Sequence, residues 1–220
     1  MAGRSFSRGE ARLDLQGHFP WGVAMSGRLQ GLTEALIARP FVYDLVQTLA
    51  GRARVGKRLK ASFAALPPGR LLDVGSADGG LASWLNCEGV FIDIDLRPLA
   101  ALRRRGRGSR AVVADAAALP FRDRAFDVSL CVAVSHHLDD HQLVGAVGEL
   151  GRVTAGSLLF LDALRKDHRR LSRWLWSHDR GRHPRTIETL RAALERRFHL
   201  RQEQEFTVYH QYVLWVGSPL

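Results

Sequence analysis

The stretch "LLDVGSADGG", residues 71–80, joins a short apolar run to a loop of small residues. The apolar run predicts a buried strand, and small residues let the backbone of the loop approach a ligand closely. Two motifs fit this loop. One is the dinucleotide fingerprint G-x-G-x-x-G, which would begin at Gly75; the other is the series D-x-G-x-G-x-G, which would begin at Asp73. In both, Ala77 takes the place of a glycine.

Acidic residues around the loop decide between the two motifs. Asp78 stands where a helix begins, and a carboxylate there competes with a pyrophosphate for the same helix N-terminus. Asp93 and Asp115 follow the next two apolar runs, "GVFIDI" and "AVVAD". Asp93 can accept hydrogen bonds from both ribose hydroxyls, and Asp115 can accept one from an exocyclic adenine amine. The loop therefore favours a ligand with a cationic group, a ribose and an adenine, but without phosphates.

Strand and helix patterns alternate from residue 68 onward, which predicts a doubly wound sheet of parallel strands. The last two strand patterns follow one another with no helix between them, so we expect an antiparallel hairpin at the sheet edge. The fold class is thus α/β: a Rossmann-like, mostly parallel, seven-stranded sheet. Strands are expected at 70–74, 89–94, 111–115, 125–134, 157–164, 199–205 and 206–217, with helices at 55–66, 97–105, 140–153 and 186–198.

The length of 220 residues suits one domain with an appended segment. We expect a mobile arm over 1–27, an N-terminal helical cap over 28–67, and the main domain over 68–220. Residues 163–185 interrupt the strand–helix rhythm and are interpreted as a lid-like insertion.

The composition is that of a globular protein without a membrane span or a signal peptide, and a cytoplasmic location is expected. Cys87 and Cys131 are isolated, so no metal site is expected. The net charge of +10 is uneven: residues 71–162 carry −3, whereas 1–70 and 163–220 carry +7 and +6. The basic flanks indicate either an anionic partner or a coding bias toward arginine.

The ordered series of motifs resembles that of the class I S-adenosylmethionine-dependent methyltransferases, over about residues 68–162. The resemblance is carried by "LLDVGSADG", "FIDID", "ADAAALPF", "FDVSLCVAVSHHL" and "GELGRVTAGSLLFLD". The similarity is greatest to the small-molecule branch that includes quinone-biosynthesis C-methyltransferases. It implies S-adenosylmethionine as the cofactor, S-adenosylhomocysteine as the product, and methyl transfer by in-line displacement.

Position by position, the resemblance also implies a cofactor site. The first loop would shape the methionine pocket, the residues after the second and third strands would hold the ribose and the adenine, and a tyrosine of the cap would touch the methionine end. Ala77 stands where the family has its middle glycine and narrows the pocket slightly, although alanine is tolerated there if φ is negative. The residues expected to bind the cofactor are Asp73, Gly75, Ser76, Ala77, Gly79, Asp93, Ile94, Asp115, Ala116, Cys131, Val132 and Tyr43.

His136 and His137 follow the fourth strand, close to where the transferred methyl group is expected. Histidine suits a general base because its ordinary pKa lies near neutral pH. His137 matches the histidine of the family signature, and both a catalytic and a structural role stay open for it. The insertion would either line a pocket for an aromatic or anionic acceptor or pack against the core, through Trp174, Trp176, Arg173, Arg180, Arg182 and His183.

The expected function is methyl transfer to a small-molecule acceptor. The alternatives are an RNA methyltransferase, suggested by the basic flanks, and a cofactor-binding protein of the same fold without turnover. Enzymes that methylate exocyclic base amines carry an Asn/Asp-Pro-Pro-aromatic motif after the fourth strand, whereas this chain has Cys131-Val132-Ala133-Val134. Nucleic acid is therefore the less favoured partner. Whether oxygen, nitrogen or carbon is methylated stays open, as does the oligomeric state.

Overall fold

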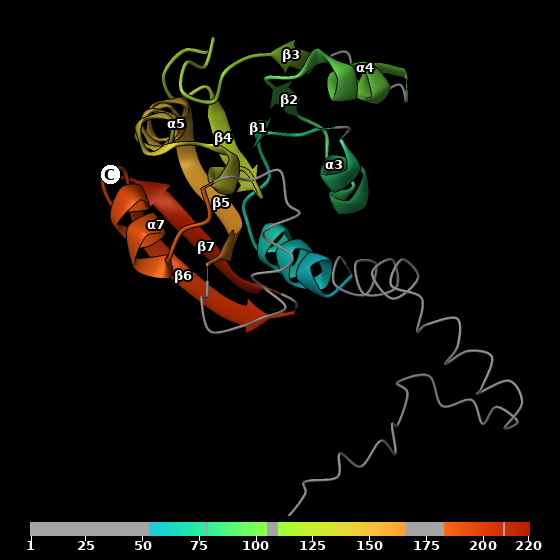
Figure 1. Cartoon of the computed structure of the whole chain (residues 1–220). Helices are drawn as coiled ribbons and strands as arrows, with labels where there is room; N and C mark the ends of the chain where they lie inside the picture. The colour runs from blue at the N-terminus through green and yellow to red at the C-terminus, as the bar shows by residue number, and fades with distance from the viewer. Residues whose placement is uncertain (1–52, 78, 105–109, 166–182, 209) are drawn as a thin grey trace, which may run out of the picture. The chain divides into compact units, whose positions relative to one another are not determined.

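The computed structural model describes residues 53–77, 79–104, 110–165, 183–208 and 210–220, and Figure 1 labels most of their elements. A helix over 53–64 comes first. It is followed by β1 (Leu71–Val74), α3 (Gly80–Leu85), β2 (Val90–Asp93), α4 (Leu96–Arg104), β3 (Ala111–Val113), β4 (Phe126–Val132), the 3-10 turn η2 (Ser135–His137), α5 (Asp140–Val153), β5 (Thr154–Leu164), α7 (Ile187–Leu194), β6 (Phe198–Thr207) and β7 (Gln211–Pro219).

The strands form one seven-stranded sheet in the order β3-β2-β1-β4-β5-β7-β6. The first five strands are parallel, and β7 pairs antiparallel with both β5 and β6. This arrangement confirms the predicted α/β fold with its antiparallel C-terminal hairpin. The strand order reverses between β1 and β4, and ligands of open α/β sheets bind beyond the carboxyl ends of the strands at such a point.

Helices cover both faces of the sheet, as parallel strands require (Figure 1). On one face, α5 and α7 pack against a core that includes Phe160 and Trp215. On the other face, Leu59 of helix 53–64 and Leu85 of α3 pack against β1, β4 and β5. Helix α4 lies against β2 and β3 through the buried residues Leu99 and Leu102. The helices packed on the two faces of the sheet thereby hold the carboxyl ends of the strands in place.

Helix α5 has the predicted bounds because its first turn is capped. The Asp139 side chain accepts from the amide of Gln142, and the Gln142 side chain accepts from the amide of Asp139. Strand β5 begins three residues earlier than predicted. Gly156 lies in it beside a bulge of β4, where a Cβ atom would be 2.5 Å from the carbonyl oxygen of Asp127. Residues 154–156, which were expected to precede the strand, are therefore part of it, and only glycine fits at position 156.

The chain divides into two compact units, Met1–Gln47 and Thr48–Leu220, and the elements above all belong to the second unit. The predicted arm over 1–27, and the predicted cap up to residue 52, lie outside the described residues. Within the described part of the chain, no helix is both long enough and apolar enough to cross a membrane.

Candidate functional site

The loop after β1 has the strained backbone expected where a chain wraps around a ligand. Gly75 and Gly79 have φ of 71° and 72°. A Cβ atom would lie 2.4 Å from Val134 at Gly75, and 2.1 Å from Leu102 at Gly79. Both positions therefore require glycine, for conformation and for space.

Ala77 also has a positive φ, of 48°. Alanine is tolerated where φ is negative, and that condition is not met here. The loop keeps the left-handed turn that a glycine would adopt, and alanine bears the conformational cost. Strain of this kind concentrates at ligand sites, where surrounding contacts hold it in place.

Asp73, at the carboxyl end of β1, carries a polar atom with no hydrogen-bond partner among the described residues. Its side chain is 1% exposed, and neither its Oδ2 nor the Oγ of nearby Ser76 has a hydrogen-bond partner. Burial, and secondarily the charge of Asp93, raise the pKa of Asp73 to about 7. An unpaired buried carboxyl group is costly, and a cationic ligand group would offset the cost. Asp73 and Ser76 together therefore fit the ammonium group of an amino-acid moiety.

Asp93 ends β2 and connects it to the glycine loop. Its Oδ2 accepts from the amide of Ala77 at 2.9 Å, and its Oδ1 accepts from the amide of Asp95 at 2.9 Å. Each carboxylate oxygen has a further lone pair, so Asp93 can still accept from two ligand hydroxyls. The next residue, Ile94, is 71% exposed, which suits an apolar surface for a flat ring.

Asp115 lies one strand farther along the sheet. The amide of Ala114 donates to the carbonyl oxygen of Asp93, which keeps the ends of β2 and β3 together. The side chain of Asp115 is exposed and accepts from the amide of Ala117. Ala116, between them, is half-buried. The structure thus brings the residues predicted for ribose and adenine to one edge of the sheet.

Cys131 and Val132 end β4, next to β1. Cys131 is buried, and burial raises the pKa of its thiol, with Asp162 and Asp73 adding to the effect. A thiol kept neutral in this way is a poor nucleophile. Cys131 can therefore form part of the wall of the site, but it is not suited to act as a nucleophile.

The two histidines after β4 differ sharply in environment. His136 is 7% exposed, and its Nδ1 lies 2.6 Å from Oδ1 of Asp162 in β5. His137 is exposed, and its ring lies against that of His136 with centroids 4.2 Å apart. The structure therefore distinguishes two residues that the sequence left together.

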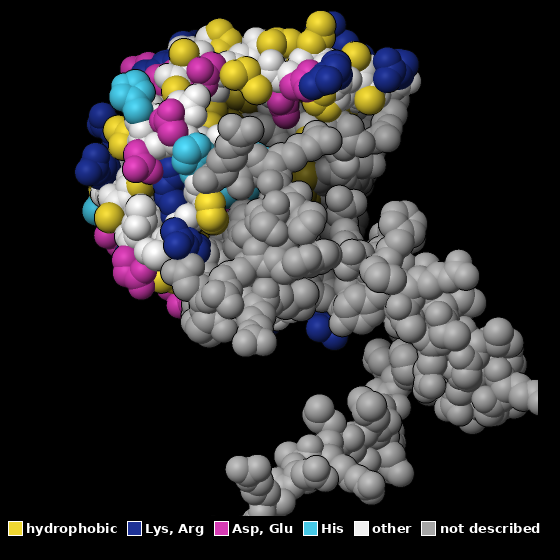
Figure 2. All heavy atoms as spheres, in the orientation of Figure 1, with side chains coloured by type: hydrophobic (Ala, Val, Ile, Leu, Met, Phe, Trp, Pro, Cys, Tyr) yellow, Lys and Arg dark blue, Asp and Glu magenta, His cyan; other side chains and the backbone are white. Residues whose placement is uncertain are grey.

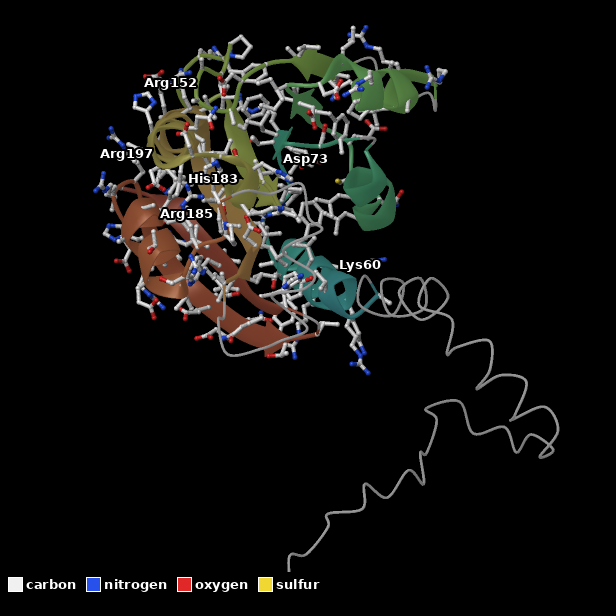
Figure 3. The ribbon with its side chains drawn as sticks, in the orientation of Figure 1. Lys60, Asp73, Arg152, His183, Arg185 and Arg197 are labelled. Carbon is white, nitrogen blue, oxygen red and sulfur yellow. The ribbon has the colours of Figure 1, made fainter. Side chains whose placement is uncertain are left out.

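Asp162, Ser135 and Arg185 belong to this site and were missed from the sequence. Asp162 is fully buried and accepts from the hydroxyl of Ser135 at 2.5 Å. Figure 3 labels Arg185 and His183 near α5, and Arg185 donates to the carbonyl oxygens of Ser135 and Leu138. The available signal for Asp162 was a lone carboxylate in the apolar run "SLLFLDAL", which requires buried partners. Nothing in the sequence singles out Arg185.

Several predicted site residues lie outside the described residues: Tyr43, Arg173, Trp174, Trp176, Arg180 and Arg182. His183 is described and exposed, and its amide donates to the carbonyl oxygen of His136. Over the described ranges, no three His, Cys, Asp or Glu side chains are grouped so as to hold a metal ion.

Comparisons with known proteins bear on the domain that carries these residues. Residues 72–160 match the model of a methyltransferase domain family. A tRNA (carboxymethyluridine(34)-5-O)-methyltransferase of Arabidopsis thaliana is 33% identical over 117 residues. That match covers 51% of this chain but only 28% of the plant protein, so the chain spans about a quarter of its length.

Two solved structures share the fold. A protein of Pyrococcus horikoshii superposes with a TM-score of 0.65 at 17% identity, covering 90% of this chain and 100% of its own. The second is the geranyl diphosphate C-methyltransferase of Streptomyces coelicolor, solved with Mg²⁺, geranyl diphosphate and S-adenosylhomocysteine. It superposes with a TM-score of 0.63 at 13% identity, covering 76% of this chain and 77% of its own. Residues 72–160 thus match a methyltransferase domain, and the chain shares the fold of these solved structures.

Proposed function

We propose that this protein transfers the methyl group of S-adenosylmethionine to a small-molecule acceptor. The observation that carries the cofactor assignment is the unpartnered, buried Oδ2 of Asp73, next to a loop with three positive-φ residues. The methionine ammonium would lie near Asp73 and Ser76, the ribose at Asp93, and the adenine between Ile94 and Asp115. The cofactor supplies a methyl group already activated on a sulfonium, so the protein mainly orients the acceptor in line with it.

The acidic character of the strand ends favours a small acceptor over a polyanion. Strands β1, β2 and β3 each have an aspartate at or just beyond their carboxyl end, and Arg97, which follows β2, is in an ion pair with Asp95. On the face drawn in Figure 2, basic side chains are interspersed with acidic ones over the described surface. Binding of a nucleic-acid backbone instead requires a continuous basic surface.

A tRNA acceptor is the second candidate, because the plant tRNA methyltransferase is 33% identical over 117 residues. The finer assignment to the branch of quinone C-methyltransferases stays a prediction, and it belongs to the first candidate.

The experiment uses the full chain and S-adenosylmethionine with a CD₃ group. Calorimetry first measures binding of S-adenosylhomocysteine; absence of binding to the folded protein would refute the proposal. The enzyme is then incubated separately with a deproteinised metabolite mixture and with bulk tRNA, and mass spectrometry locates the CD₃ label. Label in the metabolite fraction supports the first candidate. Label in nucleosides, with salt-dependent tRNA binding, supports the second. Cofactor binding with no label in either would indicate a binding protein without turnover.

A further inference from the structure

A buried carboxylate of β5, Asp162, organises the turn after β4, which lies next to the glycine loop. Asp162 is 0% exposed, and a buried charge of this kind is costly unless several donors surround it. It has three: the hydroxyl of Ser135 at 2.5 Å, Nδ1 of His136 at 2.6 Å and the amide of Ala163 at 2.7 Å. Two of the three come from the turn after β4, so Asp162 defines where that turn lies.

The main chain around His136 is fixed from the opposite side as well. Arg185, itself 7% exposed, donates at 2.7 Å to the carbonyl oxygens of Ser135 and of Leu138. The amide of His183 donates to the carbonyl oxygen of His136 at 3.0 Å. His136 is thus held through its ring and through its backbone, as a preorganised side chain must be.

The same turn lies against the glycine loop. A Cβ atom at Gly75 would be 2.4 Å from Cγ2 of Val134, two residues before His136. The turn after β4 is therefore adjacent to the pocket proposed for the methionine end of the cofactor, where the reactive methyl group is carried.

The protonation of the ring follows from its partner. With Asp162 ionised, the Nδ1 of a neutral His136 carries the hydrogen and donates it to Oδ1. The lone pair is then on Nε2, which points away from Asp162 because the two nitrogens lie on opposite sides of the ring. A carboxylate that orients an imidazole also stabilises the imidazolium formed when Nε2 accepts a proton.

We propose that His136 is the general base, that Asp162 is its positioning residue, and that the acceptor group is a hydroxyl. The assignment rests on the proposed methyltransferase function. The acceptor oxygen attacks the methyl carbon as its proton moves to Nε2 of His136. An O–C bond forms, and the electrons of the S–C bond pass to sulfur, which leaves as a neutral thioether. The imidazolium then releases its proton to solvent. A neutral amine can attack without such a base, whereas a hydroxyl is a weak nucleophile until its proton is removed.

Two substitutions separate the base from its support. His136→Asn places an amide nitrogen where Nδ1 was, so the hydrogen bond to Asp162 is kept while Nε2 is lost. Asp162→Asn removes the charge but keeps the geometry. The Ala163 amide holds the Asn oxygen at the Oδ1 position, and the Asn nitrogen can donate to the Ser135 hydroxyl. The matched control is His141→Asn, on the exposed first turn of α5.

The experiment measures transfer of CD₃ from S-adenosylmethionine to catechol, to phenol, to aniline, and to any acceptor found in the metabolite mixture. His136→Asn should lower kcat on hydroxyl acceptors about 100-fold or more. The Kd for S-adenosylhomocysteine should stay within about twofold of wild type, a difference of about 0.4 kcal/mol. His141→Asn should leave both values unchanged. Failure of the proposed function would appear separately, as loss of S-adenosylhomocysteine binding by the wild-type chain.

The pH profile tests Asp162 itself. The charged and titratable groups that face His136 among the described residues include Asp162 from β5, His137 from η2, His183, and Arg185 with its partner Asp140; Asp162 also acts on the thiol of Cys131 in β4. The Asp162→Asn substitution removes one negative charge beside His136 and leaves the other groups in place. The acidic limb of the profile of kcat against pH should therefore move to lower pH, and the maximal kcat should be lower. An acidic limb that does not shift would overturn the assignment, as would a kcat that His136→Asn does not lower. A greater loss of kcat in His137→Asn than in His136→Asn, or label on aniline but on no hydroxyl acceptor, would overturn it as well.

Discussion

The amide of Ala77 donates a 2.9 Å hydrogen bond to Oδ2 of Asp93, which connects the loop after β1 to the end of β2. This bond and the one from the amide of Asp95 each use one lone pair of the carboxylate, which leaves one lone pair on each oxygen for the proposed ribose hydroxyls. Asp93→Ala should therefore both loosen the loop and remove two charged hydrogen bonds to ribose hydroxyls. Each is worth about 1.5–3 kcal/mol, so the Kd for S-adenosylmethionine should rise at least tenfold in calorimetry.

The control for Asp93→Ala is Asp95→Ala. Asp95 is two residues away, has the same charge and is in an ion pair with the exposed side chain of Arg97. Its loss should change the affinity by less than about threefold, because exposed pairs contribute little. Equal losses in the two variants would show that general charge, rather than a specific contact of Asp93, governs binding.

Ala77 has a φ of 48°, and this conformation costs alanine about 1–2 kcal/mol relative to glycine. Ala77→Gly should raise the free energy of unfolding by about 0.5–1 kcal/mol, because the strain relieved exceeds the entropy that glycine adds to the unfolded chain. Urea denaturation measures the difference. Ala101→Gly in helix α4 should have the opposite sign, because a helix interior disfavours glycine. Destabilisation by both variants would contradict the strain at Ala77.

The fold could be predicted because each parallel strand of this chain appears in the sequence as an apolar run, and several of these runs end at or next to an aspartate. The five parallel strands all appear at the expected places, and α5 has the predicted bounds because its capping residues are adjacent in sequence. The prediction also brought Asp73, Asp93 and Asp115 to one edge, because the carboxyl ends of neighbouring parallel strands meet there.

The rest depends on contacts between residues far apart in sequence. Asp162 and His136 are 26 residues apart, and Arg185 and Ser135 are 50 apart. No local pattern specifies which buried carboxylate finds which donor. Ala77, with its positive φ, is likewise bonded to a residue of another strand, since its amide donates to Asp93.

Gly75 and Gly148 provide a matched pair for the steric requirement of the loop. Gly75→Ala places a methyl group 2.4 Å from Val134 at a φ of 71°, and should lower the free energy of unfolding by about 2–4 kcal/mol. Gly148 is in α5, and a Cβ atom there would meet no other atom within 4 Å, so Gly148→Ala should raise it by about 0.5–1 kcal/mol. Thermal unfolding of both variants measures the contrast, and a neutral Gly75→Ala would show that the turn after β4 can move away.

Arg185 holds the turn after β4 through two carbonyl oxygens and pairs with Asp140. Arg185→Met keeps much of the apolar length but leaves those oxygens without their donor. The free energy of unfolding should fall by about 2–4 kcal/mol. Arg196→Met, at an exposed site beyond α7, should change it by less than about 0.5 kcal/mol. Denaturant unfolding of the two variants measures the difference. Equally small changes in the free energy of unfolding would show that Arg185 does not support the turn.

Asp73 should give the protein a characteristic pH dependence. Its pKa of about 7 is well above the usual 3.8, chiefly through burial and then through the charge of Asp93. Between about pH 4 and 7 the native state therefore holds a proton that the unfolded chain has released. The free energy of unfolding contributed by Asp73 falls as pH rises through this window, and Asp73→Asn should remove that slope.

Cofactor binding should have the opposite pH dependence. The ammonium group of S-adenosylmethionine pairs with the ionised form of Asp73, so affinity should increase as pH rises toward about 7.5, below which an α-amino group is mostly protonated. Calorimetry near pH 6, in buffers of different ionisation enthalpy, should show proton release on binding by the wild type and a smaller release by Asp73→Asn. Binding that is flat with pH and releases no proton in the wild type would place the ammonium group away from Asp73.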